Sequence, residues 1–103
     1  MKKNIRESLF STPASLWDGT SQLSGTLELW ATEVVFRPAG FRDSHLNLSI
    51  PLAAIEKVEE YLVFNLAKNG LRIQGKQEKY DLFVLDEVRN FKLVLLKELE
   101  KLK

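Results

Sequence analysis

The stretch LSGTLELWATEVVFRP, residues 23–38, decides the fold that this sequence predicts. In its first part all the leucines stand at odd positions: Leu23, Leu27 and Leu29. This period of two is typical of a β-strand with one buried face. Ala31-Thr32-Glu33 interrupts the alternation, and Val34-Val35-Phe36 resumes it until Pro38, which has no N–H group for sheet pairing. The stretch therefore predicts a tight β-hairpin, and it contains no residues of evident chemical function.

The composition indicates a small globular protein without a strong electrostatic field. A length of 103 residues with 45% hydrophobic residues suits a single domain with one core. Fifteen basic and fourteen acidic residues leave a net charge of +1, which argues against a nucleic-acid partner. The absence of cysteine excludes disulfides, thiolate zinc sites and cysteine nucleophiles. Charged residues near the N-terminus interrupt any signal-peptide core, so we expect a cytoplasmic protein.

Alternating apolar residues and turn formers predict further strands on both sides of the hairpin. Before it, we expect a strand over Ile5–Phe10 and an irregular segment that opens at Ser11-Thr12-Pro13. The hairpin is then preceded either directly by this first strand or by a short strand at Leu16-Trp17. After it, His45–Ile50 and Lys79–Val84 show the same alternation. All these segments are predicted to belong to one antiparallel sheet.

The segment between Ile55 and Leu66 fits either a helix or a strand. An apolar stripe at helical spacing favours the first, and the run Tyr61–Phe64 favours the second through its β-branched and aromatic residues. Asn69-Gly70 is a typical type I′ hairpin turn, which needs a strand on each side. We therefore predict strands over Glu56–Leu66 and Leu71–Gln74, preceded by a turn or single helical turn at Leu52-Ala53-Ala54.

The C-terminal segment predicts an amphipathic helix that begins after Leu85. Asp86 is a suitable N-cap, and Glu87 adds negative charge to the expected first turn. One apolar stripe follows at helical spacing: Val88, Phe91, Leu95, Leu99 and Leu102. Three further apolar residues widen the apolar face beyond the needs of a single contact: Leu93, Val94 and Leu96. The complete pattern predicts a mainly β protein, with about seven antiparallel strands in a bent sheet or partly open barrel and one helix over an open end.

Two segments of the sequence resemble GRAM domains and related bacterial pleckstrin-homology-like (PH-like) domains. Gly25–Leu29 followed by Val34–Phe36 resembles their hairpin motif, and Ile50–Val58 resembles their I-P-L-x-x-I-x-x-V segment. Trp30-Ala31 departs from the Thr-Asp or Thr-Asn pair that is usual at the hairpin turn. The resemblance covers roughly Leu9 to the C-terminus and implies a barrel of seven strands capped by the C-terminal helix. Such folds bind phosphoinositides, peptides or copies of themselves, so the resemblance does not by itself assign a function.

The sequence offers no set of residues that would support catalysis. His45 is the only histidine, and with Asp43 it is too small a group for a metal site. There is no nucleophile elbow, paired-acid spacing or phosphate-binding glycine loop. We therefore expect a non-enzymatic protein without a catalytic, metal or cofactor site, and we interpret His45 as a surface or strand-edge residue.

We expect the function to be protein binding, most plausibly self-association into a homo-oligomer. The candidate interface residues are apolar positions that the predicted elements leave outward: Trp30, Leu93, Val94 and Leu96. An unpaired sheet edge is a further candidate. For Trp30, cover by the chain's own N-terminal segment is an equally supported alternative, because this side chain favours partial burial.

The alternative function is peripheral binding of anionic lipid through the loop that contains Arg37, Phe41 and Arg42. Phe41 could enter a membrane interface while the two arginines hold lipid phosphates. The competing interpretation is that Phe41 packs onto the barrel and the arginines are simply solvated. Residues 11–22, the loop region where phosphoinositide-binding relatives carry basic residues, contain no Lys or Arg, which argues against tight headgroup binding.

Overall fold

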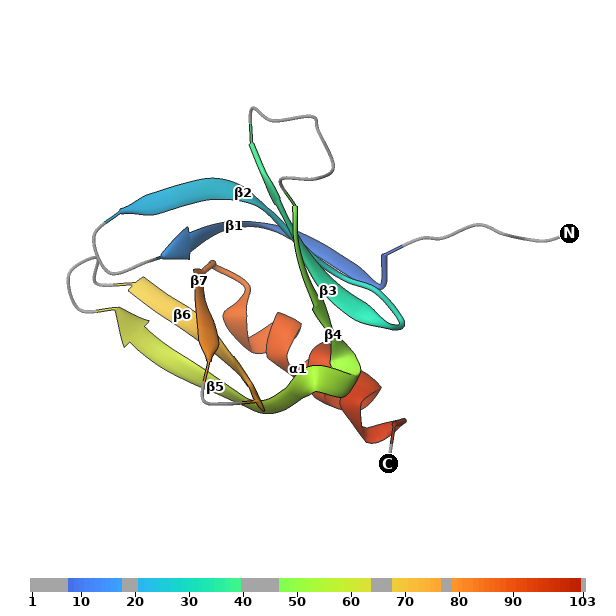
Figure 1. Cartoon of the computed structure of the whole chain (residues 1–103). Helices are drawn as coiled ribbons and strands as arrows, with labels where there is room; N and C mark the ends of the chain where they lie inside the picture. Colours follow the sequence, from blue (N-terminus) through green and yellow to red (C-terminus); the bar gives the residue numbers. More distant parts are fainter. Residues whose placement is uncertain (1–7, 18–20, 40–46, 64–67, 77–78, 103) are drawn as a thin grey trace, which may run out of the picture.

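A computed structural model describes residues 8–17, 21–39, 47–63, 68–76 and 79–102 of the chain. The described residues form seven antiparallel strands and a C-terminal α-helix (Figure 1). The strands are β1 (Phe10–Trp17), β2 (Gln22–Leu29), β3 (Glu33–Pro38), β4 (Leu48–Pro51), β5 (Ile55–Val63), β6 (Lys68–Gly75) and β7 (Tyr80–Val84). The 3₁₀ turn η2 (Leu52–Ala54) joins β4 to β5, and the helix is α1 (Val88–Glu100). The strand order is β4-β3-β2-β1-β7-β6-β5 in one sheet, so the predicted fold class is confirmed.

The predicted hairpin over residues 23–36 is confirmed. Strands β2 and β3 pair with Leu27 opposite Phe36 and Leu29 opposite Val34, and all four side chains are buried. Because directly paired residues share a face of the sheet, these four side chains form one wall of the core. β3 ends at Pro38, as the missing N–H group predicts.

The prediction for the first strand was wrong in its boundaries. Ser11-Thr12-Pro13, which we expected to be irregular, lies within β1 and pairs with β2. The strand accepts Pro13 because β1 pairs with β7 only from Ser15 to Trp17, so the other side of β1 is an edge at Pro13 and needs no N–H group there. The earlier part of the predicted strand, residues 5–7, lies outside the described residues.

The choice of a strand after Ile55 is confirmed, but the predicted Asn69-Gly70 turn was wrong. Both residues lie in β6, where Asn69 pairs with Leu62 and Gly70 with Tyr61. A Cβ atom at Gly70 would lie 2.9 Å from the backbone oxygen of Phe83 on β7. Glycine at this position therefore permits a close approach of two strands. Residues 64–67, between β5 and β6, lie outside the described residues, and the helical turn predicted at residues 52–54 is present as η2.

The C-terminal helix is present, but it begins later than Asp86 predicts. Glu87 occupies the N-cap position and makes no side-chain capping bond, so the expected cap at Asp86 and the first-turn role of Glu87 were wrong. The Glu87 carboxylate instead accepts a hydrogen bond from Asn90 Nδ2 at 2.7 Å. Of the predicted stripe, Val88, Phe91 and Leu95 are buried and Leu99 is partly buried, whereas Leu102 lies beyond the helix and is 55% exposed.

The core lies between the sheet and α1. The Phe91 ring on α1 meets the Phe10 ring on β1 edge-on, with 5.6 Å between the ring centroids. Phe36 and Phe83 form a second contact across the sheet at the same separation of 5.6 Å. Because β4 and β5 are the two ends of the strand order, each leaves one edge without a described partner strand. In Figure 1, α1 crosses the open side of the curved sheet and ends near η2.

Candidate functional site

A groove lies between β5, η2 and the C-terminal half of α1, with a volume of about 610 Å³. Its lining is mainly apolar: Leu52, Ala53, Ile55, Val58, Leu96, Leu99 and Leu102, with Glu56, Lys57 and Glu100 as the charged members. The 3₁₀ turn builds one end because the buried Leu52 side chain anchors it to the core. We refer to this feature below as the β5–α1 groove.

The three predicted interface residues of α1 have different positions. Leu96 lines the groove and is 37% exposed. Leu93 is 54% exposed and lies beside Leu96, because residues three apart are neighbours on a helix. Val94 packs against the core, so its role in an interface is less direct. Of the predicted α1 residues, Leu96 alone is part of the groove lining, and the expectation of an additional apolar face did not indicate β5 and η2 as the other walls.

Strand β5 forms the second wall of the groove and is also the end of the sheet. It has nine residues and pairs with β6 along one side. The register shifts between Ile55 and Lys57, which indicates a β-bulge at the start of the strand. Backbone groups on the free edge of such a strand can pair with an added strand.

The charged residues near the groove are unequally paired. Lys57 forms an ion pair with Glu59 at 3.3 Å, and Lys92 on α1 forms one with Glu60 at 3.6 Å. Glu56 and Glu100 line the groove and form no ion pair with any described residue. The groove lining is therefore mainly apolar, and two of its carboxylates have no ion-pair partner among the described residues.

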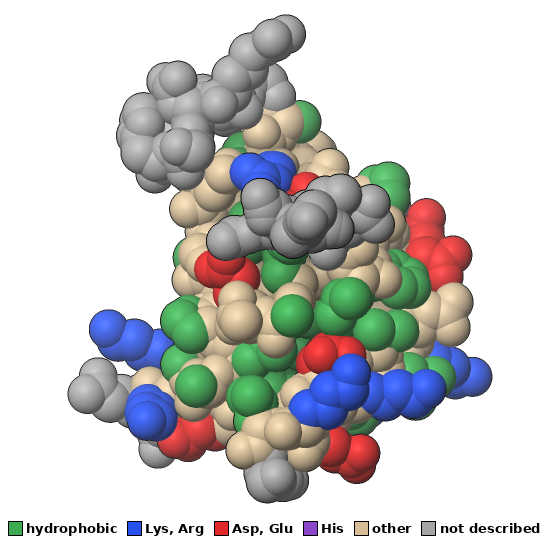
Figure 2. All heavy atoms as spheres, turned by 90° about the vertical axis from the view of Figure 1, so that its right-hand side faces the viewer, with side chains coloured by type: hydrophobic (Ala, Val, Ile, Leu, Met, Phe, Trp, Pro, Cys, Tyr) green, Lys and Arg blue, Asp and Glu red, His purple; other side chains and the backbone are tan. Residues whose placement is uncertain are grey.

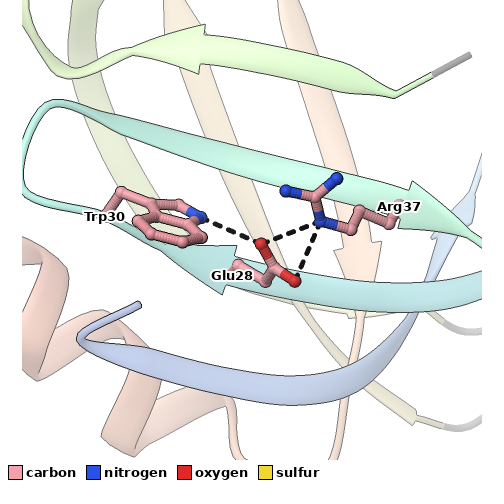
Figure 3. A network of polar contacts seen from close by, with 3 residues as sticks. All are labelled: Glu28, Trp30 and Arg37. Atoms are coloured by element: carbon pink, nitrogen blue, oxygen red, sulfur yellow. Dashed lines mark hydrogen bonds and ion pairs between the residues drawn. The ribbon is translucent and has the colours of Figure 1, made fainter. Parts of the chain in front are cut away.

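The outer face of the β2–β3 hairpin carries a network centred on Glu28 (Figure 3). Glu28 Oε1 accepts a hydrogen bond from Trp30 Nε1 at 2.9 Å. Arg37 Nε donates to both carboxylate oxygens of Glu28 at 3.0 Å. Trp30 thus lies on the outward side, as predicted, but its indole is partly buried and its polar atom is already bonded. We refer to these three residues as the Glu28 network.

Of the three lipid-binding candidates, Arg37 is the one that the structure describes. Arg37 is exposed and paired with Glu28, so part of its charge is compensated within the hairpin. Phe41 and Arg42 lie outside the described residues. None of the helices that the structure describes is long and apolar enough to cross a membrane.

Figure 2 views the side of the molecule on which the hairpin turn, η2 and the end of α1 lie in Figure 1. Hydrophobic side chains gather in the lower half of this face, with acidic and basic side chains beside them. Among the described residues, no group of three His, Asp or Glu side chains is arranged to hold a metal ion.

Comparison with known proteins gives matches at the level of structure. No family model and no curated protein sequence matches the chain. The C-terminal domain of an unknown protein from Leishmania infantum aligns with a TM-score of 0.78 at 12% identity, over 91% of this chain and 84% of that one. The Vps36 N-terminal PH domain aligns with a TM-score of 0.76 at 15% identity, over 99% of this chain and 85% of that one. This chain has a PH-like fold.

The PH-like fold is typically found in non-enzymatic modules that bind proteins or lipids. At 12% and 15% identity the two alignments establish the fold alone. The specific partner must therefore be argued from the surface of this chain.

Proposed function

We propose that this PH-like chain is a non-enzymatic protein-binding module that holds an extended segment of a partner protein along β5. The observation that carries the proposal is the coincidence of a free strand edge with an apolar groove. The backbone of β5 would pair with the added strand, and the groove would receive apolar side chains of that strand. As part of the same proposal we assign the chain to the GRAM domains, because its β2–β3 hairpin and its I-P-L segment resemble theirs.

The groove favours a partner segment that combines apolar and basic residues. Leu96, Leu99 and Ile55 offer apolar contact, and Glu56 and Glu100 offer carboxylates without an ion-pair partner among the described residues. A Lys or Arg next to the apolar residues of the segment would complement both carboxylates. We expect that charge to affect specificity and association rate more than total affinity.

A second copy of the chain is a less suitable occupant of the groove. Two copies that met groove to groove would place two surfaces with the same unpaired carboxylates against each other, and like charges at an interface are unfavourable. Self-association through this groove is therefore the competing outcome of the test. Lipid binding through Arg37, Phe41 and Arg42 has weaker support, because Arg37 Nε is already bonded to Glu28.

The experiment selects binders from a displayed library of random peptides and measures the affinity of the selected peptides for the complete chain. Leu96→Lys should weaken their binding about tenfold or more, because it places a charge on the apolar wall. Leu23→Lys is the matched control, since Leu23 is 42% exposed on β2 and lies outside the groove lining. Far-ultraviolet circular dichroism establishes that both variants fold.

The results of these measurements distinguish a partner protein from a second copy of the chain and from a lipid. Selected peptides with apolar and basic residues, sensitive to Leu96→Lys and protecting β5 amides from hydrogen exchange, support the proposal. Equal effects of Leu96→Lys and Leu23→Lys contradict it. Sedimentation that shows a dimer dissociated by Leu96→Lys, with no peptide selected, replaces the partner protein by a second copy. Binding to anionic vesicles that Arg37→Gln abolishes, again with no peptide selected, favours the lipid alternative.

A further inference from the structure

A second cavity lies on the outer face of the sheet and shares no lining residue with the β5–α1 groove. Its volume is about 480 Å³, within the usual range for a small-ligand site. Strands β1, β5, β6 and β7 supply its lining: Leu16, Trp17, Tyr61, Arg72, Tyr80, Asp81 and Leu82. The sequence indicated no site here, because these residues are far apart along the chain.

The strand register shows which side chains point into this cavity. Trp17 pairs with Leu82, and Leu82 pairs with Arg72, so these three residues form one row on one face of the sheet. Phe83, the next residue on β7, is buried in the core, so the row faces away from the core. Tyr80 lies two residues before Leu82 and therefore shares this outer face.

Tyr61 completes the aromatic lining from the end strand. It pairs with Gly70, which lies two residues before Arg72 and therefore on the same face of β6. Tyr61 is 48% exposed and Tyr80 is 54% exposed, whereas Leu82 is nearly buried. The cavity thus has an apolar floor at Leu82 and aromatic side chains around it.

The Arg72 guanidinium stacks on the Tyr80 ring, but its N–H groups make only long hydrogen bonds or none with the described residues. Its Cζ atom lies 4.3 Å from the centroid of the Tyr80 ring, which is cation–π distance. Nη2 donates to Gln74 Oε1 at 3.5 Å, and Nη1 lies 3.9 Å from Glu59 Oε1, both long for hydrogen bonds. Nε is buried and has no hydrogen-bond partner among the described residues. The side chain remains 33% exposed, so a ligand can reach the rest of the guanidinium.

The charges around the cavity favour a ligand with a single negative charge. A guanidinium presents donors in a planar fork that matches the two oxygens of a carboxylate. Arg72 is the only cation among the described lining residues, and Glu59 lies beside its guanidinium. Asp81 also lines the cavity, but it pairs with the buried Ile73, so its side chain lies on the opposite face of the sheet. A doubly charged phosphate would exceed the single positive charge of Arg72 and would be repelled by Glu59, so a carboxylate suits the site better.

We propose that this cavity binds a monocarboxylate carried on an aromatic or apolar body. The carboxylate accepts hydrogen bonds from Arg72, and the body packs against Trp17 and the two tyrosines. Two sources offer this chemistry: a free aromatic acid and the C-terminal carboxylate of a peptide that ends in an aromatic residue. This site goes beyond the protein-binding function proposed above and does not depend on it.

The test follows the Trp17 indole and backbone amide signals of the complete chain by nuclear magnetic resonance. The probes are phenylacetate, its amide, phenyl phosphate, and a short acetylated peptide ending in Phe as either free acid or amide. We expect at least one acid to shift the Trp17 signals and to bind about tenfold or more tightly than its amide, because the amide cannot form the charged pair. The tighter acid identifies the source.

Two variants locate the interaction. Arg72→Gln should reduce acid binding to the level of the amide, whereas Arg37→Gln, on the outer face of another strand, should leave it unchanged. Equal binding of acids and amides, tighter binding of phenyl phosphate than of both acids, or an unchanged affinity in a folded Arg72→Gln variant would each overturn the proposal. An absence of any shift at Trp17 would overturn it as well. The comparison of acid with amide uses the unaltered chain and remains decisive if Arg72→Gln does not fold.

Discussion

The β2–β3 hairpin and the β5–α1 groove both bring side chains with binding potential to the surface, but they differ in how these side chains are satisfied. In the hairpin, the Glu28 carboxylate pairs with Arg37 and accepts a hydrogen bond from Trp30. In the groove, Leu96 remains partly exposed, and neither Glu56 nor the outer edge of β5 has a pairing partner among the described residues.

An exposed side chain whose polar atoms are already bonded is therefore a weaker indication of a binding site than a surface whose apolar and charged groups lack partners. Trp30 is the more noticeable residue in the sequence, yet its indole nitrogen is bonded within its own hairpin. In the groove, Leu96 and Leu102 are exposed, and Glu56 and Glu100 form no ion pair with a described residue. We therefore expect changes in the Glu28 network to affect stability and changes on the groove surface to affect binding.

The largest expected effect comes from the anchor of α1, on which the groove depends. Phe91 is completely buried and contacts the Phe10 ring, so Phe91→Ala should lower the free energy of unfolding by about 3–5 kcal/mol. Urea denaturation measures this loss. Leu93→Ala, on the exposed face of the same helix, should change it by less than about 0.5 kcal/mol. Similar losses for the two variants would mean that α1 does not hold the groove through Phe91.

The sequence predicted the fold well because most of the sheet depends on local alternation. The hairpin over residues 23–36 and the apolar stripe of α1 follow from side-chain period. The strand after Ile55 was chosen instead on its β-branched and aromatic residues and on an expected Asn69-Gly70 turn, and both of these residues lie within β6. The predictions that were wrong concern residues whose structure depends on the neighbouring strands. Pro13 is tolerated because β1 is an edge at that point, and Gly70 is required by the close approach of β7. Neither fact is visible without the strand order.

The candidate site was less predictable for the same reason. The apolar residues of α1 led us to expect a second contact on the helix, and one of them, Leu96, lines the groove. The other wall comes from η2 and β5, and no local pattern connects Ile55 with Leu96. The pairing of Arg37 with Glu28 could have been anticipated only from the hairpin register, which places Thr26 opposite Arg37 and Glu28 one pair further along the same face.

A second prediction disturbs the hairpin and leaves the groove intact. A Cβ atom at Gly25 would overlap the backbone carbonyl of Arg37 and lie 2.8 Å from the Phe36 ring. Gly25→Ala should therefore lower the free energy of unfolding by about 1–3 kcal/mol through overpacking. Gly75→Ala is the control, because its added carbon would lie 3.2 Å from its nearest neighbour, the Ala54 oxygen. A control that loses as much stability as Gly25→Ala would rule out close strand packing at Gly25 as the cause.

The Glu28 network allows a smaller and more specific test. Glu28→Gln retains an oxygen acceptor for Trp30 but removes the charge that pairs with Arg37. Because Arg37 is 45% exposed, we expect a loss of about 0.2–1 kcal/mol that shrinks as salt is added. Glu33→Gln is the control, since Glu33 accepts a hydrogen bond from Ser49 and forms no ion pair with a described residue. A loss that is unaffected by salt would show that the charge of Glu28 is not what matters.

The smallest expected effect concerns Asp81, whose side chain is partly buried. Burial raises the pKa of Asp81, so the folded chain keeps this proton at pH values where the unfolded chain has lost it. Stability from this group is therefore complete below about pH 4 and is lost as pH rises through the raised pKa. Asp81→Asn should match the original chain at low pH and exceed it at neutral pH by less than about 1 kcal/mol, because the side chain is only partly buried. Urea denaturation across this pH range measures the difference. Since burial is the cause, added salt should leave it nearly unchanged, and a difference that salt abolishes would point to a neighbouring charge instead.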